Sequence, residues 1–230
     1  MGVLLMLMTI GGLVVAGILF GVAWLHQSAW LKKFVVGGVA IWFAFYVAML
    51  LGASLMSHDR TIALGDTDGK AFCGFYLDCH LHAAVTDVMR AKAIGNKTAV
   101  GEFYIVRVKV FSDAKNPNIA FRLLEPKARI AMPDGTLLGR DLDAEALLPT
   151  AGVSLDSDIK GSQTIEKDIV FNVDQPSPDL KLLITEGYGI DKTIERFLIG
   201  DDDSIFHAQQ YFALNAGTRT PSSASPLAAR

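Results

Sequence analysis

Charge is nearly absent from the first part of this 230-residue chain, because residues 1–56 carry only two charged side chains, Lys32 and Lys33. The stretches 2–25 and 34–56 contain none. Each is long enough for a helix that crosses a hydrocarbon core of about 30 Å. Since backbone polar groups in lipid must be satisfied within the segment, we predict a transmembrane helical hairpin over residues 1–56. The lack of ionisable side chains in both spans argues against an ion or proton pathway.

A cleaved signal peptide is the alternative interpretation of the first stretch. That stretch has no basic leading region and no clear small-x-small cleavage site before His26. It is also longer than the apolar part of a signal peptide. We therefore expect the first stretch to remain as a membrane helix.

The chain also lacks a basic excess and the common short catalytic motifs. Its formal net charge is −3, which argues against nucleic acid as a partner. It contains no Gly-x-Ser-x-Gly, no His-Glu-x-x-His, no phosphate-binding glycine loop and no dinucleotide fingerprint. We expect no catalytic residue, no cofactor and no enzymatic activity.

Lys32 and Lys33 set the expected orientation of the hairpin. Short loops that carry Lys and Arg stay in the cytoplasm, and no Lys or Arg precedes the first helix. The loop over residues 26–33 is therefore expected in the cytoplasm. The N-terminus and the large domain after the second helix are expected on the outer side.

Small residues recur along both predicted helices. At such spacing, helix backbones can approach closely, which drives association in lipid. Two interpretations stay open: the two helices pack on each other, or one stripe contacts another integral membrane subunit. The residues of this predicted helix-packing interface are Gly12, Ala16, Gly17 and Gly21 in the first helix and Ala40, Ala44, Ala48 and Gly52 in the second.

The remainder of the chain changes to the period of two that is typical of strands. Alternation predicts strands over residues 80–88, 102–111, 127–132, 164–173 and 180–185. In the fourth of these, Lys167 interrupts an otherwise apolar phase. Residues 133–135 read Pro-Asp-Gly, a turn signal. Residues 194–199 and 204–214 flank Gly-Asp-Asp-Asp, which predicts a further hairpin.

These short strands between Gly, Pro and Asp clusters predict a mainly β domain over residues 57–217, an antiparallel sandwich. A short helical turn is expected over residues 141–148. Residues 218–230 are small, Pro- and Ser-rich and weakly charged, which predicts a disordered tail.

The stretch from Thr61 to Gly187 resembles a family of bacterial membrane- or lipid-anchored immunoglobulin-like domains of unknown function. The matching features are Leu64-Gly65-Asp66, the strand 101–111, the turn 133–135, Gly161-Ser162 before the strand 165–173, and the pattern LKLLITEG over 180–187. The resemblance implies an immunoglobulin-like sandwich, held at the periplasmic side of a bacterial inner membrane, with no catalytic residues. Two membrane helices depart from the single anchor that is usual in such proteins.

The two cysteines and two histidines near residue 80 form the densest cluster of reactive side chains. Cys73 and Cys79 are too few for a disulfide-rich scaffold, but they can form one bridge in an oxidising compartment. The alternatives are unlinked thiols, or a copper or zinc site of Cys73, Cys79, His80 and His82. If residues 80–88 form a strand, His80 and His82 point to the same face.

Two hypotheses for function follow from these patterns. The first is a non-catalytic accessory or scaffold subunit of a larger respiratory, photosynthetic or secretory membrane complex, with the lipid bilayer and other integral membrane subunits as partners. The alternative is a periplasmic metal-binding or redox domain that uses the Cys73–His82 cluster. The sequence does not indicate whether a small-molecule ligand binds.

Overall fold

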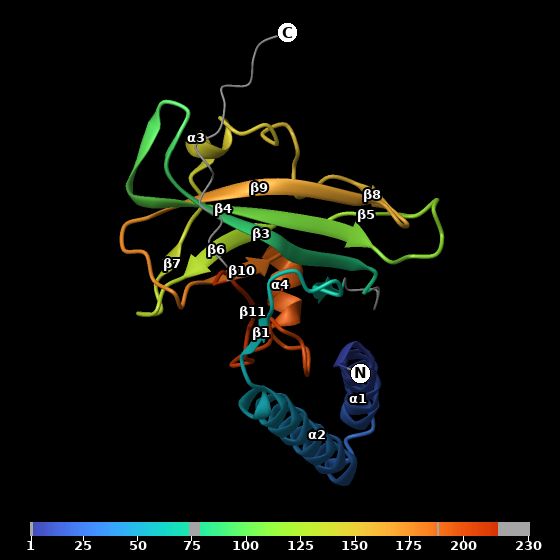
Figure 1. The fold of residues 1–230 in the computed structure, drawn as a ribbon. Helices are drawn as coiled ribbons and strands as arrows, with labels where there is room; N and C mark the ends of the chain where they lie inside the picture. The colour runs from blue at the N-terminus through green and yellow to red at the C-terminus, as the bar shows by residue number, and fades with distance from the viewer. Residues whose placement is uncertain (1, 74–78, 188, 216–230) are drawn as a thin grey trace. The chain divides into compact units, whose positions relative to one another are not determined.

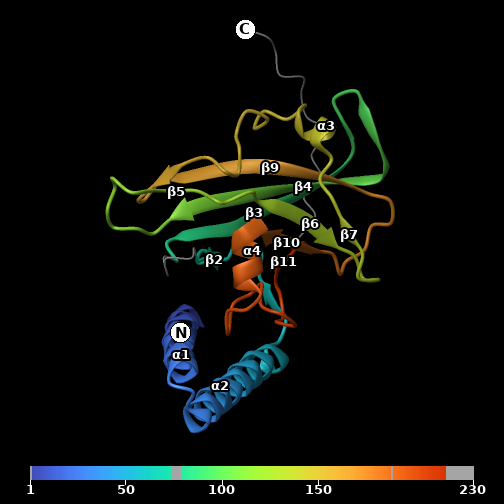
Figure 2. The same ribbon diagram turned by 180° about the vertical axis from the view of Figure 1, so that it is seen from behind.

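The computed structural model describes residues 2–73, 79–187 and 189–215. The tail predicted over residues 218–230 lies outside the described residues. Within them the chain forms two compact units. One contains the residues up to Asp59 together with the segment Gly189–Gln209, and the other contains Arg60 to Gly187 together with the residues from Gln210 on. Figures 1 and 2 show the helices and strands of both units.

Two apolar helices form most of the first unit, as the hairpin prediction requires. Helix α1 spans Gly2–Leu25 and helix α2 spans Ala29–Met56. Their mean hydropathies reach 2.6 and 2.3, so both are long and apolar enough to cross a membrane. Helix α2 begins five residues earlier than expected. The Ser28 hydroxyl accepts a hydrogen bond from the Leu31 amide and caps the helix, so Lys32 and Lys33 lie in its first turns.

The segment Gly189–Gln209 contacts helix α2 and does not form the expected hairpin. The strand predicted over residues 194–199 is wrong, because residues Gly189–Glu195 form helix α4. Ile194, Phe197 and Leu198 also have the i, i+3, i+4 spacing of a helix face, which period-two counting overlooks. The Tyr46 hydroxyl donates to the Phe197 carbonyl oxygen at 2.6 Å, and the Ala208 amide donates to the Ser57 hydroxyl at 2.7 Å.

Two β-sheets make up the second unit. One has the strand order β1-β11-β10-β6-β7, and the other has the order β2-β3-β4-β9. Strand β1 pairs with β11 in parallel, and the other pairings are antiparallel. The first sheet contains Arg60–Ile62 (β1), Gln210–Ala213 (β11), Lys181–Thr185 (β10), Lys127–Ala131 (β6) and Leu137–Leu138 (β7). The second contains Lys70–Phe72 (β2), Leu81–Ile94 (β3), Lys97–Ser112 (β4) and Thr164–Val173 (β9).

Both sheets contribute side chains to one core, so the unit is a two-layer β-sandwich. Val106 and Phe171 from the second sheet cluster with Ile130, Leu182 and Phe212 from the first, and all five side chains are fully buried. The five strands predicted between residues 80 and 185 are confirmed, with β3 and β4 longer than expected. Alternation succeeds here because alternate residues of each strand face the common core.

Smaller elements close the ends and one outer face of the sandwich. Strand β5 (Ala120–Phe121) pairs with β8 (Ile159–Lys160). Helix α3 (Leu142–Glu145) confirms the predicted helical turn, and its Ala144 packs with Phe103 and Val170 in a second apolar cluster. Gly135 adopts a φ of +84° in the predicted turn between β6 and β7, a conformation that glycine allows without strain.

Candidate functional site

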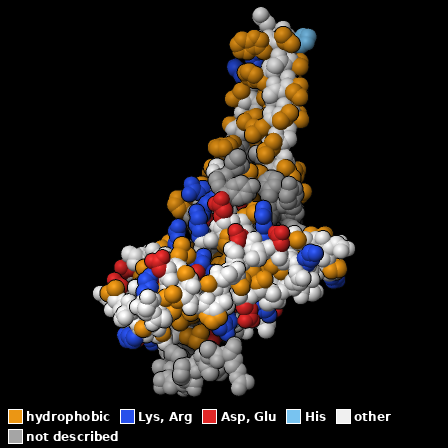
Figure 3. All heavy atoms as spheres, turned by 90° about the horizontal axis from the view of Figure 1, so that it is seen from above, with side chains coloured by type: hydrophobic (Ala, Val, Ile, Leu, Met, Phe, Trp, Pro, Cys, Tyr) orange, Lys and Arg blue, Asp and Glu red, His pale blue; other side chains and the backbone are white. Residues whose placement is uncertain are grey.

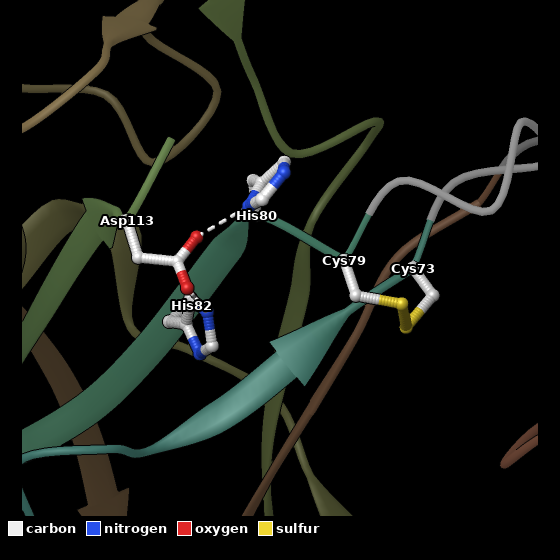
Figure 4. Close-up of a disulfide and its surroundings, with 5 residues drawn as sticks. All are labelled: Cys73, Cys79, His80, His82 and Asp113. Atoms are coloured by element: carbon white, nitrogen blue, oxygen red, sulfur yellow. Dashed lines mark hydrogen bonds and ion pairs between the residues drawn. A yellow bond between two sulfur atoms is a disulfide. The ribbon is translucent and has the colours of Figure 1, made fainter. Parts of the chain in front are cut away.

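A disulfide joins the two cysteines at the end of the β2–β3 hairpin where the chain passes from β2 to β3 (Figure 4). Cys73 directly follows strand β2, and Cys79 lies two residues before strand β3. The last residue pair of the hairpin is Phe72 with Leu81, so the bond closes the hairpin just beyond its final pair. The predicted disulfide is confirmed, and the covalent link ties the short strand β2 to the long strand β3.

Two histidines beside the disulfide share one carboxylate, that of Asp113. The His80 Nδ1 lies 2.6 Å from Asp113 Oδ1, and the His82 Nε2 lies 3.5 Å from Asp113 Oδ2 (Figure 4). His82 also stacks on Phe111, with the ring centroids 5.2 Å apart. Its Nδ1 lies 3.1 Å from the Asp68 carbonyl oxygen. Because a carbonyl oxygen only accepts, this contact places a proton on Nδ1 of His82.

The long hairpin of β3 and β4 brings Asp113 to the histidines. Leu81 pairs with Ser112, and the Asp113 amide donates to the His80 carbonyl oxygen at 3.1 Å. Sequence reasoning missed Asp113, which lies 33 residues from His80. The signal that could have found it is the pairing of strands β3 and β4, which sets the end of one beside the start of the other.

The histidines change the electrostatics of the shared carboxylate. The pKa of Asp113 is lowered from its usual value of 3.8, chiefly because His80 hydrogen-bonds to it. Positive charge on His82 and His80 lowers the pKa further. The Asp113 side chain is 56% exposed, so water screens these interactions. The arrangement therefore holds Asp113 ionised and fixes the end of strand β4 against the start of β3.

The copper or zinc site predicted as an alternative needs Cys73, Cys79, His80 and His82 as four ligands, and the structure does not offer all four. The sulfurs of Cys73 and Cys79 are bonded to each other, whereas metal binding by cysteine needs a thiolate. Across residues 2–73, 79–187 and 189–215, no group of three or more His, Cys, Asp or Glu side chains could hold a metal ion. His80 and His82 do lie together, as their spacing predicts, but Asp113 is their partner.

The small residues of the predicted helix-packing interface lie mostly on exposed helix surface. Ala16 and Gly52 are half-buried, and the other six are exposed. A Cβ atom added at Gly12, Gly17, Gly21 or Gly52 would meet no atom within 4 Å. Ala23 of α1 and Val35 of α2 are buried, and a hydrogen bond from Trp42 Nε1 to Thr9 Oγ1 joins α2 to α1. Packing of these stripes on another membrane subunit stays a prediction.

No protein-family model and no curated protein sequence matches the chain. Among solved structures, the chain is similar to MPT63, a secreted protein from Mycobacterium tuberculosis. The two are 14% identical, and the alignment covers 68% of this chain and 98% of that chain, with a TM-score of 0.41. A TM-score this low does not establish a shared fold, so the description as a β-sandwich rests on the two sheets and their common core. The chain thus combines a disulfide-containing β-sandwich with two apolar helices.

Proposed function

We propose that this protein is a non-catalytic, membrane-anchored accessory or scaffold subunit of a larger membrane complex. The helices α1 and α2 form the anchor, and the sandwich lies on the periplasmic side of a bacterial inner membrane. Lipid and other integral membrane subunits are its partners. The observation that carries the proposal is the apolar surface that the two helices leave uncovered.

That surface is too large and too continuous for a chain surrounded by water. In the apolar stretches that make the helices possible membrane spans, 0% of the residues of α1 and 11% of those of α2 are buried. Large apolar side chains such as Ile41, Trp30 and Leu25 are at least 73% exposed. Figure 3 shows hydrophobic side chains along the helices and mixed charges over the β-sheets. Soluble monomers rarely expose apolar patches beyond about 600 Å², so lipid or a partner covers these helices.

The sheet order supports the immunoglobulin-like grouping within this proposal. Immunoglobulin-like sandwiches place strands A, B and E side by side in one sheet and strands C, F and G in the other. Here β3, β4 and β9 are neighbours in one sheet, and β6, β10 and β11 are neighbours in the other. In chain order, the six strands β3, β4, β6, β9, β10 and β11 correspond to strands A, B, C, E, F and G. Strands β1 and β2 are additions before that set.

The charges and the disulfide support the proposed orientation. Lys32 and Lys33 lie at the end of α2 that joins α1, and Lys residues in short connections favour the cytoplasmic side. Two spans then return the chain to the outer side. The Cys73–Cys79 disulfide fits that side, because disulfides persist in the periplasm and are rare in the cytosol.

A groove between the helices supports a partner within the membrane. The groove has a volume of about 370 Å³ and an almost wholly apolar lining that includes Gly12, Ala16, Gly38 and Trp42. Small residues in its walls leave room for another helix to approach closely. Ala40, Ala44 and Ala48 of α2 are exposed and form a second surface that another helix could approach closely.

The test is the native mass of the tagged, full-length protein after gentle solubilisation. We expect an assembly much heavier than the 24.8 kDa chain with its detergent, and mass spectrometry should identify its other subunits. A single chain in every mild detergent would contradict the proposed role.

Two double variants of α2 test whether the partners bind to its exposed alanine stripe. Ala44→Leu with Ala48→Leu adds bulk along the exposed stripe of α2 and should release the partners. Ile41→Leu with Phe43→Leu alters two other exposed positions of α2 with little change in apolarity, and it should leave the assembly intact. Equal recovery of the partners with both pairs would contradict docking through the stripe.

A further inference from the structure

Lys167 breaks the pattern of the strand that contains it. Ile165, Ile169, Phe171 and Val173 of β9 face the core of the sandwich, and Lys167 falls in the same phase. The Lys167 side chain is buried at that position, with only 7% of it exposed. A buried ammonium group costs free energy unless it is paired and hydrogen-bonded. Core positions that break the apolar rule often belong to functional sites.

The carboxylate of Glu145 lies near Lys167, but it is already paired with Arg140. The Glu145 side chain is 5% exposed, and its Oε1 accepts from Arg140 Nε at 2.7 Å and from the Val170 amide at 3.1 Å. Its Oε2 accepts from Arg140 Nη2. Lys167 Nζ is 4.0 Å from Oε2, which is an ion pair but too long for a hydrogen bond.

Among the buried and half-buried side chains at this point, positive charge therefore exceeds negative charge. Arg140 and Lys167 supply two positive charges, and Glu145 supplies one negative charge. The Lys167 ammonium donates one hydrogen bond, to the Val153 carbonyl oxygen at 2.6 Å. An ammonium has three N–H donors, so Lys167 retains donors for a further acceptor.

The two cations line a polar cavity of about 430 Å³. The loop that contains Gly152, Ser154 and Asp156 forms part of its wall. The volume falls within the range of about 300–1,000 Å³ that is usual for small-molecule sites. Glu125, Lys127 and Asp156 also line the cavity but are exposed, so water and salt screen their charges. Lys167, which is buried, and Arg140, which is half-buried, are screened less than these three.

We propose that this cavity binds a small oxyanion, the carboxylate or phosphate group of a soluble ligand, through Lys167 and Arg140. An oxyanion matches the unbalanced positive charge and accepts the hydrogen bonds that Lys167 still has to donate. The Arg140–Glu145 pair holds the guanidinium in place while one edge of it remains for the ligand. The site belongs to the sandwich itself and does not depend on the membrane anchor.

Calorimetric titration of the full-length protein in detergent tests the proposal, with inorganic phosphate and succinate as probes and chloride as the reference anion. We expect saturable binding of phosphate, of succinate or of both, and none of chloride. Binding of phosphate alone identifies a phosphoryl group as the ligand's anion, and binding of succinate alone identifies a carboxylate. If neither anion binds more tightly than about 10 mM, the proposal is overturned.

Gly152 offers a matched pair of variants that leaves the core intact. A Cβ atom there would meet no atom within 4 Å, and the residue lines the cavity. Gly152→Asp adds a negative charge to the cavity and should raise the Kd at least about tenfold, whereas Gly152→Asn has nearly the same shape and should leave it unchanged. Lys167→Met should also weaken binding about tenfold or more. Equal Kd values for the aspartate and asparagine variants would overturn the site.

Discussion

Removing the Cys73–Cys79 bond should weaken the sandwich by an amount that the loop length predicts. The cysteines are separated by 6 positions, so the bond closes a loop of seven residues. In the chain-entropy model, closing such a loop in the unfolded chain contributes about 2.4 kcal/mol near room temperature. For a domain of this size, that free energy corresponds to a fall in Tm of about 5–10 °C.

The perturbation is Cys73→Ser with Cys79→Ser in the full-length protein. Far-ultraviolet circular dichroism follows the unfolding of the β-sheets, and wild-type protein measured with a thiol reductant is the control. Because β2 pairs with β3 over three residue pairs next to the bond, we expect both samples to fold but to melt earlier than the oxidised protein. If the free energy of unfolding falls by less than about 0.5 kcal/mol in both samples, the reasoning is refuted. The bond would then restrict the unfolded chain too little to stabilise the domain.

Three further predictions concern the core and its charges. Phe171→Ala should cost about 3–5 kcal/mol, because the ring is fully buried between the sheets; a denaturant titration measures this, and a loss below about 1 kcal/mol would contradict it. The lowered pKa of Asp113 means that its stabilising contribution is present above the unfolded value of 3.8 and is lost as the pH falls through the lower folded value. Wild type should therefore melt above Asp113→Asn at neutral pH, and thermal melts at a series of pH values should show this difference shrinking as the pH falls below 3.8. Arg140→Met should cost about 3–5 kcal/mol in the same denaturant titration, because it strips the buried Glu145 carboxylate of its bidentate partner; a loss below about 1 kcal/mol would contradict this.

Local patterns in the sequence were sufficient for the strands that have one buried face. Tyr104, Val106, Val108 and Val110 alternate with Arg107 and Lys109 along β4, and the burial follows that alternation. The segment around residues 194–199 shows the limit of such counting. Its apolar residues fit a strand and a helix equally well. In the structure helix α4 ends at Glu195, and the Phe197 carbonyl oxygen accepts a hydrogen bond from Tyr46 of α2, which lies 151 positions away in sequence.

The candidate sites could be predicted only in part, for a related reason. Cys73 and Cys79 lie close in sequence, so the disulfide was foreseeable, and so was the shared face of His80 and His82. Asp113 was not, because its position depends on the pairing of two long strands. Lys167 could be noticed as an interruption of β9, but its neighbours Arg140 and Glu145 come from a loop and helix α3, which local patterns do not place beside β9.

The proposed anchoring is tested most directly by the location of the sandwich in cells. Alkaline phosphatase, which is active only in an oxidising compartment, and a fluorescent protein, which matures in the cytoplasm, can be fused in turn to the end of the chain that follows strand β11. We predict phosphatase activity in the membrane fraction and no fluorescence from the second fusion. Fluorescence with an inactive phosphatase, or recovery of the fusions as soluble protein without detergent, would contradict a sandwich tethered on the outer side of the membrane.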